Sequence, residues 1–297
     1  MRTSFAESWF ALLIAAATLP TPAHADDPRA TPAPRGYVAI IIDDLGEQHL
    51  GGLHAARLPG PVALAFLPGA PYTVHQAALA HARGKEVLLH LPMQPAGPAR
   101  AHPASLTADA DPAQLREYFR VALASVPYAA GVNNHQGSLM TTREAPMDGL
   151  MREISLRPGL YFVDSRTTAG SVAYRSARLH GVPSTERNVF LDAQRGEKSV
   201  RAEFARLVAK ALRDDRALAI GHPYPETFKV LEEELPQLAA RYGVRLVAPS
   251  ELIARQSGWR GPYRPSRPGA APMLTAATPS TRTPLPAHRA ARSVAAR

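Results

Sequence analysis

Carboxylate, amide and imidazole side chains follow several apolar runs of this sequence, at the points where those runs end. These residues are Asp43, Asp44, His90, Asn133, Asn134, His135, Asp164 and His222. Two histidines and one carboxylate, with a fourth position open to water, form a common hydrolytic zinc site, in which the metal polarises a carbonyl and lowers the pKa of water. Because the chain contains no cysteine, any metal must be held by histidine, carboxylate or water. The residue types therefore indicate a hydrolase with a divalent metal.

Hydrolysis at such a site also needs a base and an acid. A second carboxylate next to the liganding one can take the proton of the attacking water, and a further histidine can protonate the departing amine. Adjacent residues of a strand point to opposite faces, but a chain that turns at Gly46 can present both Asp43 and Asp44 to the same opening. The alternatives are helix capping and turn formation for the two aspartates, and a buried, hydrogen-bonded role for His90 and His135. His222, which precedes Pro223, could instead close a turn.

The elements that must position these residues alternate between short apolar runs and stretches of helical spacing. Strands are predicted over residues 37–42, 62–66, 86–89, 130–132, 160–163, 188–191, 217–220 and 244–247. The clearest helices are predicted over residues 74–83, 112–125, 200–213 and 226–242. Such alternation implies an α/β fold with a mostly parallel sheet, closed or nearly closed into a distorted (β/α) barrel; an open doubly wound sheet is the alternative. In a parallel barrel the carboxyl ends of all strands share one rim, so residues spread over about 180 positions converge there.

The first 25 residues have the layout of a secretory signal peptide. Arg2 precedes an apolar run at residues 9–19, and small residues flank His24 just before Asp26. Because the run is too short to cross about 30 Å of hydrocarbon as a helix, we expect a protein secreted into the periplasm, with no transmembrane helix after cleavage. An uncleaved segment that stays as an anchor is the alternative. Residues 26–35 are predicted to form a linker, and residues 36–258 the folded domain.

The formal net charge of +9 comes mainly from the C-terminal end of the chain. Residues 259–297 contain seven arginines, seven prolines and no acidic residue, whereas residues 36–258 contain 24 basic and 22 acidic residues. A nearly neutral domain has little excess positive charge to bind phosphate groups, so we expect no nucleic-acid partner. The composition of the last segment predicts a disordered tail, which either contacts anionic wall polymers or lipid headgroups or has no partner.

Five ordered segments resemble the divergent polysaccharide deacetylase family, which is related to the carbohydrate esterases of the NodB-homology type. The segments are 40–46 (IIIDDLG), 90–95 (HLPMQP), 131–138 (GVNNHQGS), 161–165 (YFVDS) and 219–223 (AIGHP). The resemblance covers residues 37–253, nearly all of the predicted domain. It implies a distorted (β/α) barrel, a divalent metal cofactor, with zinc expected, and N-deacetylation of amino-sugar polymers.

The resemblance also implies roles for individual residues. Asp43 resembles the catalytic base and Asp44 the metal-binding carboxylate of the family. His90 matches the first metal-binding histidine, and His222 matches the late histidine that acts as general acid. The typical member has a second histidine four places after the first, where this chain has Gln94.

The departure at this position leaves one metal ligand to be found elsewhere in the chain. Glutamine is a poor ligand for zinc, and we infer that His135 takes the place of the second histidine. The Arg-Pro-Pro segment of typical members is replaced by Val132, Asn133 and Asn134, and the two asparagines either bind sugar hydroxyls of the substrate or complete a turn. Asp164 either orients a histidine as an auxiliary catalytic residue or forms an ordinary ion pair.

Three functions fit this pattern of residues. The first is a metal-dependent hydrolase that deacetylates N-acetylated amino-sugar polymers of the cell envelope, such as peptidoglycan-like material. The second is a binding or regulatory module without turnover, whose partner is an envelope glycan or an envelope protein; Gln94 favours it. The third is a metal amidase or esterase for another envelope polymer.

Overall fold

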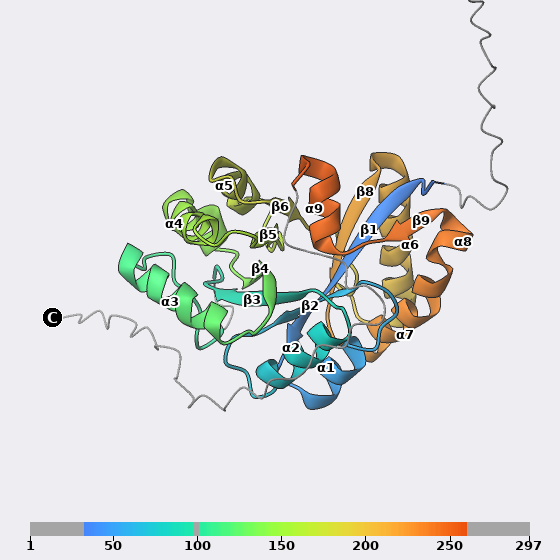
Figure 1. Ribbon diagram of the computed structural model, residues 1–297, viewed down its shortest axis with the longest axis horizontal. Coiled ribbons are helices and arrows are strands. Elements are labelled where there is room, and N and C mark those ends of the chain that lie inside the picture. Colours follow the sequence, from blue (N-terminus) through green and yellow to red (C-terminus); the bar gives the residue numbers. More distant parts are fainter. Residues whose placement is uncertain (1–32, 98–100, 260–297) are drawn as a thin grey trace, which may run out of the picture. The chain divides into compact units, whose positions relative to one another are not determined.

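A computed structural model of the chain describes residues 33–97 and 101–259 (Figure 1). The predicted signal segment, most of the predicted linker and all but the first residue of the predicted tail lie outside the described residues. The strands are β1 (Gly36–Leu45), β2 (Ala63–Phe66), β3 (Val87–Met93), β4 (Ala129–Gln136), β5 (Tyr161–Asp164), β6 (Ser184–Glu186), β7 (Val189–Phe190), β8 (Arg216–Gly221) and β9 (Val244–Leu246). β3 and β4 run on beyond their predicted ends, so His90 and the Asn-Asn-His sequence lie inside strands rather than after them.

All strands of the sheet pair in parallel. Their order is β6-β5-β4-β3-β2-β1-β8-β7, and β9 pairs with the first residues of β1. β6 and β7 stand at the two ends of this order, yet only Arg187 and Asn188 separate them in the chain. Because so short a connection spans about 10 Å at most, the sheet has to curl until its two edges approach each other. The curled parallel sheet confirms the predicted barrel-like α/β fold rather than the open doubly wound alternative.

Helices follow most of the strands and cover the outer face of the sheet (Figure 1). They are α1 (His49–Ala55), α2 (Thr73–Ala82), α3 (Pro112–Ala124), α4 (Glu144–Ser155), α5 (Ala173–Leu179), α6 (Glu197–Asp214), α7 (Pro225–Glu234), α8 (Leu238–Tyr242) and α9 (Pro249–Ser257). The prediction of one helix over residues 226–242 is wrong. A single 3-10 turn, Leu235–Gln237, divides α7 from α8, because Pro236 lacks the backbone N–H that would continue the α-helical hydrogen bonds.

Alternate residues of the strands pack on the two faces of the sheet. On β1, Ile40 packs outward against the helices, whereas Ala39 and Ile41 face the interior of the barrel. The interior side chains form a second apolar cluster, to which α9 adds Leu252 and Ile253. The interior of the barrel is therefore a packed core, closed in part by the last described helix.

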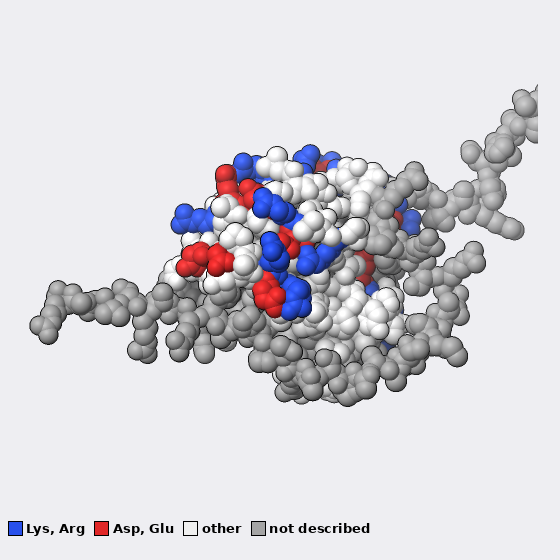
Figure 2. All heavy atoms as spheres, turned by 60° about the vertical axis from the view of Figure 1, so that its left-hand side comes forward, with Lys and Arg blue, Asp and Glu red and all other residues white. Residues whose placement is uncertain are grey.

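The surface of the domain carries charges of both signs close together. Figure 2 shows Lys and Arg beside Asp and Glu on the face that it presents. On α3, Arg120 pairs with Glu117 at 2.6 Å, and Arg175 of α5 pairs with Glu144 of α4 at 2.5 Å. Among residues 33–97 and 101–259, no helix is both long and apolar enough to span a bilayer.

Candidate metal centre

The alternation of the strands decides which predicted site residues reach the interior of the barrel. Ile41 of β1 and Leu88 of β3 belong to the interior cluster, and residues two places further along a strand share that direction. The predicted site residues in this interior phase are Asp43, His90, Asn133, His135 and His222. Three others, Asp44, Asn134 and Asp164, fall in the opposite phase.

Asp44 reaches the same opening because β1 is irregular at its end. The pairing of β1 with β2 shifts register between Ile42 and Leu45, and Asp44 has a φ of 55°. A left-handed residue turns the chain out of simple alternation, and aspartate is one of the few non-glycine types that adopt this conformation readily. Gly46 follows with a φ of 105°, where a Cβ would lie 2.2 Å from Thr73 Oγ1. This turn presents both neighbouring aspartates to the mouth of the barrel, as the sequence predicts.

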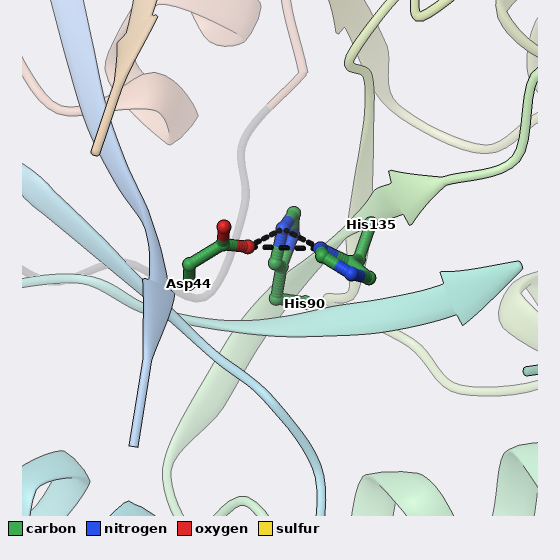
Figure 3. A group of neighbouring side chains, drawn as sticks. All are labelled: Asp44, His90 and His135. Carbon is green, nitrogen blue, oxygen red and sulfur yellow. Dashed lines mark hydrogen bonds and ion pairs between the residues drawn. The ribbon is translucent and has the colours of Figure 1, made fainter. Parts of the chain in front are cut away.

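Asp44, His90 and His135 turn their ligand atoms toward one another (Figure 3). Asp44 Oδ1 lies 2.8 Å from His135 Nδ1 and 3.1 Å from His90 Nε2, and the two ring nitrogens are 3.2 Å apart. The three residues come from β1, β4 and β3, and a ligand atom of each lies within 4.8 Å of the others. His90 is buried, whereas the other two side chains are partly exposed. The structure therefore brings together the three predicted metal ligands in a group that is open on one side.

Asp43 lies deeper than this group and is almost completely buried. Its Oδ2 is 3.6 Å from His90 Nε2, and its Oδ1 accepts a hydrogen bond from Asn133 Nδ2 at 2.8 Å. The same amide contacts His90 through its oxygen, which is 2.9 Å from His90 Nδ1. Asn133, predicted to contact substrate or complete a turn, is thus fully buried between the two residues.

Burial and hydrogen bonding move the protonation equilibria of the two aspartates in opposite directions. Burial raises the pKa of Asp43 above its ordinary value. Burial alone would also raise the pKa of Asp44, but hydrogen bonds from His135 and His90 outweigh it and hold that pKa well below its usual range. A carboxylate that stays charged suits a cation ligand, and one with a raised pKa suits a proton acceptor.

His222 follows β8 and lies on another side of Asp44, with Nε2 3.7 Å from Asp44 Oδ2. Its Nδ1 is 2.9 Å from Oδ1 of Asp192, a buried carboxylate that also accepts the backbone N–H of His222 and the hydroxyl of Thr227. Burial would lower the pKa of His222, but the hydrogen bond to Asp192 and the charges of Asp44 and Asp43 outweigh it and raise this pKa to about 9. The imidazole is therefore held as a proton donor, with Nε2 toward the metal centre.

The replacement Asp192→Asn is expected to lower kcat of any hydrolysis at this site by about 10- to 100-fold, because the amide no longer fixes the proton of His222 on Nδ1. Steady-state kinetics on metal-loaded protein measures the effect. Thr227→Val is the matched control, since it removes a hydrogen bond to the same carboxylate but leaves the carboxylate itself in place. Equal losses in both variants would mean that packing, and not the carboxylate, supports His222.

Asn134 and Asp164, in the opposite phase, serve the loops around the site. Asp164 Oδ2 accepts a hydrogen bond from Ser171 Oγ at 2.7 Å. The amide of Asn134 accepts the N–H of Ser165 at 2.9 Å and donates to the carbonyl of Gln136 at 2.8 Å. Within the described part of the chain, the hydrogen bonds of both side chains run to the end of β4 and to residues 165–174 after β5 rather than to the histidines.

Gln94 stands where typical members of the resembled family have their second metal-binding histidine, but its hydrogen bonds join two loops. Its side-chain oxygen accepts the N–H of Ala108 at 2.9 Å, and its carbonyl accepts the N–H groups of Leu139 and Met140 at 3.2 and 3.1 Å. The residue thus ties the segment after β3 to the segment after β4. Because Gln94 has this structural role, it does not compete with His135 for the third position in the group of candidate ligands.

Two residues near the site, Asp192 and His102, were not predicted from the sequence. Asp192 directly follows the predicted strand 188–191, so the signal that identified the other residues also applied to it. His102 lies in the segment between β3 and α3, with its ring centroid 5.8 Å from that of His135. No apolar run precedes His102, and the sequence pattern therefore could not place it at the rim.

A cavity of about 700 Å³ opens on the same rim. Its lining includes Gln94, directly after β3, and Leu139 and Thr142, after β4. Asp109 and Arg143 add charged side chains to its wall. The segments after the two strands that carry His90 and His135 thus line a separate hollow, and the described residues of its wall include none of those of the candidate metal centre.

The sequence matches the family model of divergent polysaccharide deacetylases over residues 40–253. The matched range contains every residue of the metal centre as well as Asp43, Asp192 and His222.

Known relatives resemble the chain over most of its length. The uncharacterized protein YibQ of Escherichia coli (strain K12) is 35% identical over 224 residues, which are 75% of this chain and 69% of YibQ. An uncharacterized protein of Haemophilus influenzae (strain ATCC 51907 / DSM 11121 / KW20 / Rd) is 34% identical over 201 residues, 68% of this chain and 71% of the relative. A crystal structure of an uncharacterized protein from Agrobacterium tumefaciens C58 has a TM-score of 0.70 at 25% identity and covers 73% of this chain and 89% of its own.

Proposed function

Because the chain belongs to the divergent polysaccharide deacetylase family, we propose that it is a metal-dependent hydrolase that removes acetyl groups from N-acetylated amino-sugar polymers of the cell envelope. The observation that carries the proposal is the convergence of Asp44, His90 and His135, with a buried carboxylate on one side and the His222–Asp192 pair on the other. The location in the envelope rests on the signal-like N-terminal segment.

The residues of the centre fit a divalent cation such as zinc. The donor set is one carboxylate oxygen and two imidazole nitrogens, the combination that hydrolytic zinc sites use when a further position stays open. His90 is oriented for this role, because its Nδ1 is occupied by Asn133 and its Nε2 faces Asp44 and His135. When bound, the ion would polarise the acyl carbonyl and lower the pKa of water.

The remaining chemistry falls to side chains of this chain. The carboxylate of Asp43 accepts the proton of the water whose oxygen attacks the acetyl carbon. His222 donates a proton from Nε2 to the amine nitrogen as the carbon–nitrogen bond breaks, while its Nδ1 keeps its own proton in the hydrogen bond to Asp192. Acetate and a free amino sugar leave the site.

The hollow that the segments after β3 and β4 line favours a polymer over a small substrate. At about 700 Å³ it falls within the usual range for ligand pockets, and its wall includes Asp109 and Arg143, which suit a hydroxyl-rich chain. We propose that sugar units next to the one deacetylated lie here. The rate of acetate release is then expected to rise with oligomer length.

Acetate release tests the proposal directly. The purified protein is loaded with Zn²⁺, Co²⁺ or Mn²⁺ and incubated with acetylated chito-oligomers or muropeptides. Acetate is expected with at least one metal and is lost on chelation. A folded, metal-loaded protein that releases no acetate would refute the deacetylase, and a wider panel of amides and esters then separates another hydrolase from a binding module. Glycan affinity that is unchanged in Asp43→Asn, in a protein without turnover, would support the binding module.

A further inference from the structure

Asn133 occupies the centre of the interior side of the site. It is completely buried on β4 and pairs in register with His90 of the neighbouring strand β3. Asp43 of β1 is separated from it by two strands in the order of the sheet, so this contact crosses the interior of the curl. One amide group thus joins two residues that stand 43 and 90 positions away in the sequence.

The chemistry of the three groups determines the direction of both hydrogen bonds. The carboxylate of Asp43 can only accept when it is ionised, so the amide must turn its NH₂ toward it, in agreement with the 2.8 Å contact from Nδ2. The amide oxygen then faces His90 Nδ1 at 2.9 Å and can only accept, so the ring proton must lie on Nδ1. In the neutral ring the lone pair of His90 is therefore on Nε2, the nitrogen that faces Asp44 and His135, and a hydrogen bond from this nitrogen to Asp44 forms only when the ring is doubly protonated.

We infer that Asn133 is a positioning residue that holds His90 in its ligand-ready tautomer and at the same time holds the carboxylate of Asp43 in place. The half that concerns Asp43 rests on the proposed function; the half that concerns His90 needs only metal binding. An amide is the group that can serve both neighbours, because it offers a donor to the carboxylate and an acceptor to the imidazole. Partners of this kind set the orientation of metal-binding histidines.

Two replacements of Asn133 separate its role toward His90 from its role toward Asp43. Asn133→Ala removes both the acceptor for His90 and the donor for Asp43. Asn133→Asp keeps an acceptor oxygen for His90 but places a second carboxylate against Asp43 in place of the donor. Asn134→Ala is the matched control for metal affinity, since Asn134 is an equally buried amide whose hydrogen bonds run to Ser165 and Gln136.

The tautomer is measured by ¹⁵N NMR of the metal-free protein, at a pH where the His90 ring is neutral, with His90→Ala identifying its signals. We expect the Nδ1–H form in the wild type and in Asn133→Asp, and a mixture with the Nε2–H form in Asn133→Ala. An Nε2–H ring in the wild-type protein would overturn the inference, whatever the behaviour of the variants. This measurement depends on neither a substrate nor a bound metal.

Calorimetric titration with Co²⁺ and the acetate assay give the second readout. Asn133→Ala is expected to lower Co²⁺ affinity by about 10- to 100-fold, and Asn133→Asp and Asn134→Ala to stay within about threefold of the wild type. Asn133→Asp should nevertheless lose about 100-fold in acetate release with the metal bound. An Asn133→Asp protein that loses Co²⁺ as Asn133→Ala does, or an Asn134→Ala protein that loses it equally, would overturn the inference. If the wild type binds Co²⁺ but releases no acetate, the proposed function fails while the role of Asn133 toward His90 is still decided.

Discussion

An Asp43→Asn protein is expected to keep its fold and its metal but to lose about 10³-fold in kcat of acetate release. Asparagine has the same shape and keeps an oxygen for the hydrogen bond from Asn133, so the neighbouring His90 is not displaced. It cannot take a proton from the attacking water, however, and this loss removes the base. Single-turnover kinetics on protein of measured metal content gives the effect on the chemical step.

Glu86→Gln is the matched control for this experiment. Glu86 is another buried carboxylate inside the barrel, but it lies before β3, at the opposite end from the metal centre, where it accepts hydrogen bonds from Tyr161 and Ser250. The same change from carboxylate to amide at Glu86 is expected to leave kcat within about threefold of the wild type. Comparable losses in the two variants, or more than a tenth of the activity left in Asp43→Asn, would remove Asp43 from the role of base.

His135→Ala is expected to reduce the bound divalent metal from about one ion per chain to nearly none. The loss of affinity should exceed the 10- to 100-fold that removal of a supporting partner typically costs, because here a ligand itself is lost. Elemental analysis after dialysis gives the metal content. The rise in melting temperature on addition of Zn²⁺, which a cation bound only to the folded state must produce, should disappear as well.

The control for this variant is His54→Ala. His54 also pairs with a carboxylate, Glu232 at 2.7 Å, but it lies on α1 and is half exposed. Metal content is expected to stay unchanged in this variant. Full metal content in His135→Ala would contradict the assignment of His135 as a metal ligand. A loss of metal in His54→Ala would indicate that the cation binds at α1.

The order of elements and the barrel were predictable because local signals agree with the global fold. The unbroken apolar run that forms the centre of β1 is buried on both faces, which is the pattern of a central parallel strand. The ends of the strands were harder to predict than their order. β4 continues through Asn133 and Asn134, polar residues that a strand tolerates only when its neighbours supply hydrogen-bond partners, and those neighbours come from remote parts of the chain.

The site was predictable as a set of residues, and the two-residue period of the strands would have sorted it further. Asp43, His90 and His222 share the direction of the interior apolar residues, so their convergence follows from the pattern once the strands are placed. The same two-residue period puts Asp164 on the outer face of β5, where it contacts Ser171.

The place of Asp44 could not be obtained by such counting. Its direction depends on a left-handed residue and a shift of register against β2, which arise only when the two strands pair. The contact of His135 with His90 and Asp44, which the sequence predicts only by elimination of Gln94, likewise depends on pairing, because pairing places β4 beside β3.

The packing of α9 into the barrel has a consequence for the order of events during biosynthesis. Leu252 and Ile253 complete a core whose other members begin with Ala39, and β9 pairs with the start of β1, so contacts between the first and last described elements are needed to finish the interior. Contacts this distant in the chain form late, because the intervening loop must be closed first. A nascent polypeptide from which α9 has not yet emerged lacks part of its apolar core, so the interior of the barrel cannot close before this helix is available.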